Sequence, residues 1–333
     1  MTDTRVAPDR DVPDSDPDAA ETFALLANET RVDVLLALWD AHDPGEETSP
    51  LSFSALFDRV DYDDAGNFSY HLERLTGQFV RRTADGYVIR DTGLSVVRSV
   101  VAGTGIQDAS LSPTTVDRAC PLCGAPTTVS YDDGVLYQAC TDCAGVVDRE
   151  HLPEGYLNSF PLDPAGLTGR SAGELLEAAE IAAYRHVRSM FEGLCSSCSG
   201  PVDASLEACA DHAADGVCER CGHEPAVTAR FRCRVCRDFH GTTPAAVCVV
   251  HPSVVAFLAD HGVAPHWHAA DADGLAPIRE ADPTFETDVV ARDPLRAAVT
   301  VRLRGDELRC TFDGTVSVVD VSRGPPAGAE RFD

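Results

Sequence analysis

The sequence predicts a multidomain α+β protein, and three observations support this fold class. Its 333 residues suffice for two or three domains of about 150 residues each. Apolar residues recur at helical spacing over much of residues 18–105, and at strand spacing in several later segments. Cysteines occur as C-x-x-C pairs within residues 115–150 and 195–240, a pattern typical of small metal-stabilised β units.

Charge and composition exclude several classes of protein. The chain has 54 acidic against 27 basic residues, and every basic residue is Arg, which gives a net charge of −27. A hydrophobic content of 44% is normal for a folded protein and excludes general disorder. Such acidity keeps a protein hydrated in concentrated salt. It argues against a nucleic-acid coat protein or a binder of anionic membranes, but leaves room for a local DNA-binding face.

The chain divides into consecutive regions. No apolar run is long enough for a transmembrane helix, and the acidic start is unlike a signal peptide, so we expect a cytoplasmic protein with no membrane contact and with reduced cysteines. The expected regions are a disordered acidic tail (1–17), a helical domain (18–105), a cysteine-paired unit (115–150), a linker and helix (151–194), a second cysteine-rich region (195–240), a small α+β domain (244–322) and a tail (323–333).

Residues 18–105 are expected to begin with a series of helices. Helical apolar spacing over residues 23–39 is interrupted at Asn28. Ser52 is positioned to cap a further helix, and Asp63 or Asp64 to cap the next. The last of these helices turns Phe68, Leu72 and Leu75 inward. These signals predict short helices packed around one core.

A hairpin is expected to follow these helices. Asp85 and Gly86 separate two segments rich in β-forming residues, and residues 94–101 carry a last apolar helical stripe. The order helix, helix, short turn, helix, hairpin is that of a winged helix-turn-helix. In this fold a recognition helix enters the major groove of DNA.

Polar residues on the expected recognition helix and hairpin are candidates for DNA contact. Asn67 can read adenine, and Arg74 can read guanine or bind phosphate. Residues 65–90 carry four Arg against two acids, whereas residues 1–64 carry four Arg against seventeen acids. At His71, helix packing is the more ordinary role. The candidate DNA-binding residues are Asn67, Ser69, Tyr70, His71, Arg74, Arg81, Arg82 and Arg90.

Three segments resemble ArsR-type winged-helix regulators. Leu25-Leu26-Ala27-Asn28-Glu29-Thr30-Arg31-Val32-Asp33-Val34-Leu35 resembles their entry helix, and Ser69-Tyr70-His71-Leu72-Glu73-Arg74-Leu75 their recognition helix. Phe79-Val80-Arg81-Arg82 through Gly86-Tyr87 resembles their wing. With its cysteine-rich second half and its lack of Lys, the chain resembles the haloarchaeal branch of these regulators.

The resemblance covers residues 18–103. It implies a homodimeric DNA-binding protein, typically a repressor, with the first helix and residues 94–101 at the dimer interface. Because residues 18–103 contain no cysteine, metal-responsive release from DNA through the site used by metal-sensing members is not expected.

The first cysteine region has the spacing of a zinc ribbon. Its ligands would be Cys120, Cys123, Cys140 and Cys143, in the pattern C-x2-C-x16-C-x2-C. Strands over residues 127–131 and 135–138 would bring the two turns together. The rival hypothesis is a pair of redox disulfides, but the βαβ context of a thioredoxin-like motif is absent.

The second region supplies eight possible ligands, enough for two four-coordinate sites and about three zinc ions per chain. The simplest partition is sequential, although an interleaved one is also possible. The sequential sites would be Cys195, Cys198, Cys209 and His212, followed by Cys218, Cys221, Cys233 and Cys236.

Several nearby residues are assigned to structure instead. The apolar run 245–250 around Cys248 indicates a buried strand, His251 before Pro252 indicates a helix entry, and Cys310 is expected in the core. His266 and His268 are expected on a half-buried strand edge. The arginines at 230, 232, 234 and 237 either meet phosphate or an acidic partner, or balance the charge of zinc-bound thiolates.

Together these patterns favour a transcriptional regulator that binds double-stranded promoter DNA, with zinc ribbons as structural or partner-binding modules. No nucleophile elbow or phosphate-binding loop occurs, so an enzyme is not expected. Two alternatives stay open: a zinc-ribbon scaffold that binds protein or RNA, and a thiol or metal sensor.

Overall fold

The computed structural model describes residues 17–43, 50–103, 109–147, 149–212, 217–263 and 276–324. It is a mixed α and β structure that divides into two compact units, Met1–Gln107 and Asp108–Asp333. The predicted tails and His266 and His268 lie outside the described residues, except that Pro17 already begins a helix and Arg323 belongs to a strand. Among the described helices, none combines the length and apolar character needed to span a bilayer.

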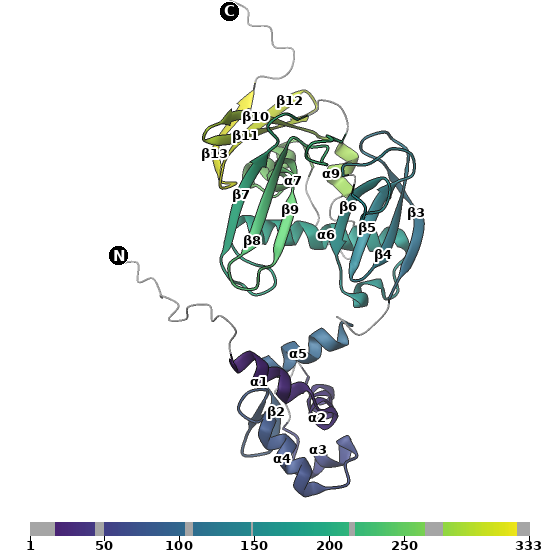
Figure 1. The fold of residues 1–333 in the computed structure, drawn as a ribbon, viewed down its shortest axis with the longest axis vertical. Coiled ribbons are helices and arrows are strands. Elements are labelled where there is room, and N and C mark those ends of the chain that lie inside the picture. The colour runs from purple at the N-terminus through teal and green to yellow at the C-terminus, as the bar shows by residue number, and fades with distance from the viewer. Residues whose placement is uncertain are drawn as a thin grey trace, which may run out of the picture. The chain divides into compact units, whose positions relative to one another are not determined.

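The first unit contains five helices and a two-stranded antiparallel sheet within its described residues (Figure 1). In chain order these elements are α1 (Pro17–Leu26), α2 (Glu29–Asp40), α3 (Phe53–Val60), α4 (Ala65–Leu75), β1 (Val80–Arg82), β2 (Tyr87–Ile89) and α5 (Asp91–Val101).

Side-chain caps fix where three of these helices begin. The side chain of Asn28 accepts a hydrogen bond from the N–H of Arg31, and Ser52 accepts one from Ala55. Asp64 accepts from the N–H groups of Gly66 and Asn67 at the start of α4. Each cap satisfies a backbone donor that the first helical turn leaves without a partner. The predicted helix starts at Asn28, Ser52 and Asp64 are therefore confirmed.

The hairpin is held to the segment that precedes α3 through a two-way backbone pairing. Leu51 N–H donates to the Tyr87 carbonyl at 3.0 Å, and Tyr87 N–H donates to the Leu51 carbonyl at 2.8 Å. Gly86 has φ of +145°, and a Cβ on it would lie 2.2 Å from the Leu51 carbonyl oxygen. Only glycine permits this close approach. Phe68, Leu72, Leu75 and residues of α2, β1 and α5 form the core beneath.

The second unit begins with a four-stranded antiparallel sheet in the order β3-β4-β5-β6. Its strands are β3 (Leu111–Ala119), β4 (Pro126–Asp132), β5 (Val135–Cys140) and β6 (Tyr156–Pro161). A short 3-10 helix, η1 (Pro164–Leu167), leads to the twenty-residue helix α6 (Ala172–Phe191), which starts at a capping box formed by Ser171 and Glu174.

Helix α6 joins two hydrophobic cores (Figure 1). Its first half buries Leu175, Leu176 and Ala179 against the first sheet. Its second half buries Val187 and Met190 in the core of the following region. One helix therefore serves as a common support for both parts of the second unit.

In the rest of the second unit, the described residues form two antiparallel sheets and three short helices. The sheets are β7-β8-β9 and the meander β10-β11-β12-β13. The elements are β7 (Val202–Ala208), β8 (Val227–Cys233), β9 (Phe239–Thr242), α7 (Pro244–Val249), α8 (Pro252–Asp260), α9 (Ala276–Ala281), β10 (Thr284–Arg292), β11 (Leu295–Leu303), β12 (Asp306–Asp313) and β13 (Val318–Gly324).

Residues 245–250 form most of helix α7, so the predicted strand there is wrong. Thr243 caps this helix by accepting from the N–H of Ala246, and Pro244 occupies the first turn. The prediction of a helix entry at His251 is confirmed, because His251 caps α8. Cys248 and Cys310 are both fully buried. The regions expected as 195–240 and 244–322 share one hydrophobic core.

Candidate metal centres and nucleic-acid interface

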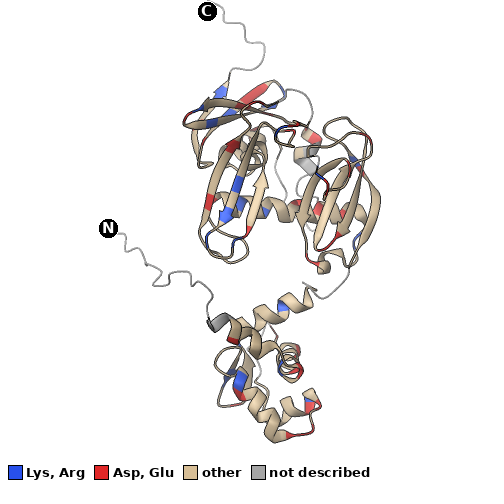
Figure 2. Ribbon diagram, viewed as in Figure 1, with Lys and Arg blue, Asp and Glu red and all other residues tan. Residues whose placement is uncertain are grey.

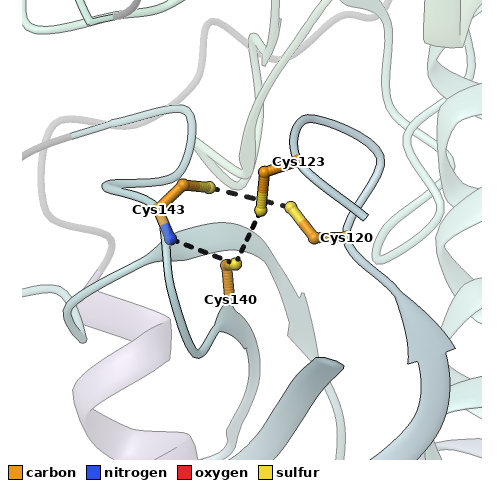
Figure 3. Close-up of side chains that lie close together, drawn as sticks. All are labelled: Cys120, Cys123, Cys140 and Cys143. Atoms are coloured by element: carbon orange, nitrogen blue, oxygen red, sulfur yellow. Dashed lines mark hydrogen bonds between the residues drawn. The ribbon is translucent and has the colours of Figure 1, made fainter. Parts of the chain in front are cut away.

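The first four cysteines converge at one end of the β4–β5 hairpin (Figure 3). Cys120 and Cys123 lie in the turn before β4, whereas Cys140 ends β5 and Cys143 follows it. Sγ–Sγ distances are 3.7 Å between Cys120 and Cys143 and 3.5 Å between Cys123 and Cys140. A tetrahedron with Zn–S bonds of about 2.3 Å has edges of about 3.8 Å. A disulfide bond measures about 2.05 Å, so this spacing fits a shared metal ion.

Backbone donors surround these sulfurs. The N–H groups of Cys143 and Asp142 point at the Cys140 sulfur, each at 3.3 Å, and they lower the pKa of Cys140 to about 6. The Leu122 N–H reaches the Cys120 sulfur at 3.4 Å. Because a metal ligand must be a thiolate, donors that stabilise negative sulfur prepare the cluster for a cation.

The second cysteine region forms two further clusters, and the simple sequential partition is wrong. Cys195 and Cys198 group with Cys233 and Cys236, while Cys209 and His212 group with Cys218 and Cys221. The Sγ–Sγ distances are 3.6 Å from Cys195 to Cys236 and 3.5 Å from Cys198 to Cys233. We call the three clusters site 1 (120–143), site 2 (195–236) and site 3 (209–221).

Strand pairing explains this interleaving. β7 and β8 are antiparallel, and Val202 at the start of β7 lies opposite Cys233 at the end of β8. The turn before β7 therefore meets the turn after β8, just as the turns flanking the β4–β5 hairpin meet in site 1. Ala208 and Val227 pair at the other end of the hairpin, so site 3 lies in the connection between the two strands.

Site 3 uses one histidine. His212 Nδ1 lies 3.7 Å from the Cys221 sulfur, while its Nε2 lies 2.9 Å from the Glu224 carbonyl oxygen. A carbonyl bonded to the outer nitrogen fixes the tautomer that leaves Nδ1 free for a metal. The histidine ligand predicted from sequence therefore has the geometry that this role requires. Glu224 is a supporting residue that sequence reasoning missed, because it contributes through a backbone oxygen.

Four of the cysteine turns share one backbone geometry. In each, the first cysteine N–H donates to the carbonyl five residues later, at 2.7–3.0 Å: Cys120 to Ala125, Cys195 to Gly200, Cys218 to His223 and Cys233 to Asp238. The residue before each acceptor has a positive φ, and these residues are Gly124, Ser199, Gly222 and Arg237. Glycine tolerates that conformation at two of the turns, whereas Ser199 and Arg237 adopt it at some cost.

Sites 1 and 3 belong to regions that touch. Val147 and His223 form an antiparallel bridge, and the Glu224 N–H donates to the Val146 carbonyl at 2.7 Å. Arg149 also contacts the His223 ring at 3.1 Å. The loop that follows site 1 is therefore hydrogen-bonded to the turn of site 3.

Helix α4 separates its candidate DNA-contact residues into two groups. Asn67, Tyr70 and Arg74 are exposed and Ser69 is half-buried. His71 is only 8% exposed, and its ring lies against the rings of Tyr62 and Tyr70. Burial, together with the charge of Arg31, lowers the pKa of His71. His71 lies on the buried stripe of α4 with Phe68, Leu72 and Leu75. It therefore does not lie on the exposed face, where a DNA-contacting residue would have to be.

The hairpin arginines are exposed but differ in their surroundings. Arg81 and Arg82 point away from the core, and the Arg82 guanidinium lies 5.8 Å from the centre of the Tyr87 ring. Arg90 donates to the Gly77 carbonyl. Among the described residues, Arg74, Arg81 and Arg82 form no ion pair. Several arginines of the second unit, by contrast, pair with carboxylates.

Comparisons with known proteins identify two family models. One, described as a domain of unknown function (DUF7347), matches residues 19–100. No curated protein matches the chain. A solved structure of the Rio2 kinase–ADP/Mg2+–phosphoaspartate complex from Chaetomium thermophilum is 14% identical, over 85% of this chain and 74% of that one. Its TM-score is 0.26, which is too low to indicate a shared fold.

The second family model covers the region that holds the three candidate metal clusters. Described as a domain of unknown function (DUF7351), it matches residues 117–318, more than half of the chain. The chain therefore belongs to the DUF7351 family.

Proposed function

We propose that the chain is a DNA-binding transcriptional regulator whose first unit is a winged helix-turn-helix. One observation carries this proposal: α4 is capped and packed so that Asn67, Tyr70 and Arg74 share one exposed face. They stand at positions i, i+3 and i+7, beside the buried stripe of the same helix. Asparagine and arginine are the side chains best suited to hydrogen-bond adenine and guanine in the major groove.

The two-stranded sheet would act as the wing. Arg81 and Arg82 are consecutive exposed residues of β1, and Figure 2 shows the blue of basic residues on this hairpin. Arginines without carboxylate partners are available for phosphate. The pairing of Leu51 with Tyr87 gives the hairpin a third, one-residue strand, which would hold the wing in place.

Exposed apolar residues support a homodimer. Phe23 on α1 is 75% exposed and Val101 on α5 is 57% exposed, and both helices pack on α2. Isolated exposed side chains are common, but two on adjacent terminal helices suit a self-complementary surface. Light scattering should give a dimer for the wild type and a monomer for a Phe23→Asp/Val101→Asp variant. A monomeric wild type would contradict this part of the proposal.

The three clusters would hold zinc as structural ions. Each cluster consists of four cysteine or histidine side chains. Four such ligands are the composition of structural zinc sites. The second unit would serve as a scaffold or partner-binding module for the regulator. Elemental analysis should find three zinc ions per chain.

Chromatin immunoprecipitation with sequencing tests DNA binding in the cell. Discrete promoter peaks that share a roughly palindromic motif are expected. Peaks that are absent, or that follow RNA or a protein complex instead, would contradict the regulator and favour the scaffold alternative.

A matched pair of variants tests the interface in vitro. Arg74→Ala/Arg82→Ala should weaken binding to the identified operator by at least about tenfold, since each removes a base or phosphate contact worth about 1–3 kcal/mol. Arg185→Ala/Arg188→Ala removes the same charge from α6 in the second unit and should leave affinity unchanged. Equal effects of the two pairs in fluorescence anisotropy would show that only net charge matters.

A further inference from the structure

A cavity of about 620 Å³ lies within the second unit, apart from the three metal clusters. Its walls are β6, the last strand of the first sheet, and β9, the last strand of the second. Helix α6 lines the cavity where it passes between its two cores, and α7 and Ile278 of α9 complete the lining. This volume is in the range of small-molecule sites. The cavity is therefore large enough for a compound of about two or three rings.

The lining is aromatic on opposite sides. Tyr156 and Phe160 come from β6, Tyr184 comes from α6, and Phe239 and His240 come from β9. The His240 ring also packs on the His186 ring, with centroids 4.9 Å apart. Rings contributed by three separate elements offer flat surfaces on which a planar compound can stack.

The described lining of the cavity carries almost no net charge. Burial, together with the neighbouring His186, lowers the pKa of His240 to about 4, so the ring is neutral near pH 7. Among the lining residues that the structure describes, Glu180 is the one carboxylate, and Arg118 lies 3.6 Å from it. A charged ligand would lose its hydration here without finding an opposite charge that is not already paired.

We propose that this cavity binds an uncharged, planar aromatic compound, stacked between the rings of β6 and β9 above α6. Polar groups at the rim of the compound would meet Asn158, Ser159 and Thr242, which line the same space. Edge strands also present backbone N–H and C=O groups, which can orient a ligand. The proposal concerns the second unit alone and does not depend on DNA binding by the first.

The test uses the full-length, zinc-loaded chain and two fluorescent probes with the same ring skeleton. N-phenyl-1-naphthylamine is neutral, and 1-anilinonaphthalene-8-sulfonate carries one negative charge. The neutral probe should bind saturably, at one site per chain, and at least about tenfold more tightly than the anionic probe. Binding of the sulfonate with equal or higher affinity would overturn the assignment of an uncharged ligand.

Two neighbouring alanines on α6 provide a matched pair of variants. Ala183 lines the cavity and Ala182 is exposed outside it. Ala183→Trp should fill the space and raise the Kd of the neutral probe at least about tenfold, whereas Ala182→Trp should change it less than about twofold. Equal affinities in these two variants would overturn the location of the site.

A second variant keeps the test valid if Ala183→Trp does not fold. Phe239 is 56% exposed at the rim, so Phe239→Ala should leave the zinc content unchanged. It should raise the Kd of the neutral probe several-fold, because one stacking surface is lost. An unchanged Kd would contradict stacking against β9. The Arg74→Ala/Arg82→Ala variant should bind the probe like the wild type, which separates this inference from DNA binding.

Discussion

The pairing of ligands in sites 2 and 3 makes a prediction that two double variants can decide. Cys195 and Cys233 share site 2, whereas a sequential arrangement would place them in different sites. Cys195→Ala/Cys233→Ala should therefore destroy one of the three sites and leave two. Cys195→Ala/Cys209→Ala should damage both site 2 and site 3 and leave site 1. The sequential arrangement predicts the reverse order of zinc content.

The expected loss is large enough to measure. Structural zinc sites typically have apparent binding free energies of about 10–16 kcal/mol. A site that keeps two of its four ligands should lose roughly half of that, which exceeds a thousandfold in affinity. A site that keeps three, as both damaged sites of Cys195→Ala/Cys209→Ala do, should lose roughly a quarter, or about a hundredfold or more. Site 2 is well suited to the experiment because Cys195 and Cys233 are buried and both take part in its close sulfur contacts.

Native mass spectrometry after dialysis against a competing chelator gives the count directly. Cys248→Ala is the control, because Cys248 is a buried cysteine outside the three clusters and its loss should leave all three ions in place. Equal zinc content in the two double variants, or a higher content in Cys195→Ala/Cys209→Ala, would refute the interleaved arrangement.

Three further predictions concern stability. Gly86→Ala should destabilise the first unit by about 2–4 kcal/mol, because its Cβ would collide with the Leu51 carbonyl; the unfolding midpoint followed by Trp39 fluorescence checks this. Ser199→Gly should stabilise site 2 by about 1 kcal/mol by removing a positive-φ penalty, seen as slower zinc loss to a chelator. The pKa of His240 is lower in the folded state than in the unfolded state. The stabilisation of the folded protein by the neutral ring is therefore complete above about pH 6.5 and is lost as the pH falls toward 4. His240→Phe should remove up to about 3 kcal/mol of that pH dependence in denaturant titrations.

Local signals predicted the first unit well. Asn28, Ser52 and Asp64 cap helices through contacts with residues two or three positions away, and Asp85 and Gly86 lie in the turn of the hairpin. Such contacts depend on a few neighbouring residues and are therefore readable from sequence. His71 was harder to place, since its position in the stripe suits either a buried or a boundary residue.

Longer-range features were missed for identifiable reasons. Residues 245–250 form a short apolar run that periodicity cannot assign, and the informative signal was the Thr243-Pro244 pair at the helix start. The cavity could not be predicted, because Tyr156 of β6 and Phe239 of β9 are 83 positions apart in the chain (239 − 156), and the fold brings them to opposite walls beside α6. Nothing in either strand alone marks it as a wall.

The arginines of β8 and of the turn that follows it show how the chain uses its few positive charges. Arg230 lies 3.0 Å from Glu207, and Arg234 bonds Asp203, so two of the four arginines pair with carboxylates of the adjacent strand. These pairs engage Arg230 and Arg234 within the protein, and neither pair involves a cysteine thiolate, so the choice between a phosphate site and thiolate balancing stays a prediction. By contrast, the described part of the chain leaves Arg74, Arg81 and Arg82 without such partners. Among the described residues Arg232 and Arg237 likewise form no ion pair, so the lack of a carboxylate partner leaves Arg74, Arg81 and Arg82 available to an external anion without setting them apart from the second unit.

The interleaved pairing of the residues in sites 2 and 3 follows from hairpin geometry, and it gives a rule for similar sequences. Two antiparallel strands of a hairpin bring the residues before the first strand close to the residues after the second. A C-x-x-C motif before the first strand should therefore share a site with the C-x-x-C motif after the second. The alternation of Val227, Ala229, Phe231 and Cys233 with outward residues marks β8 as a strand. Applied to this alternation, the rule assigns Cys195 and Cys198 to Cys233 and Cys236. The remaining ligands in the connecting loop then form site 3 among themselves, which is the arrangement in the structure.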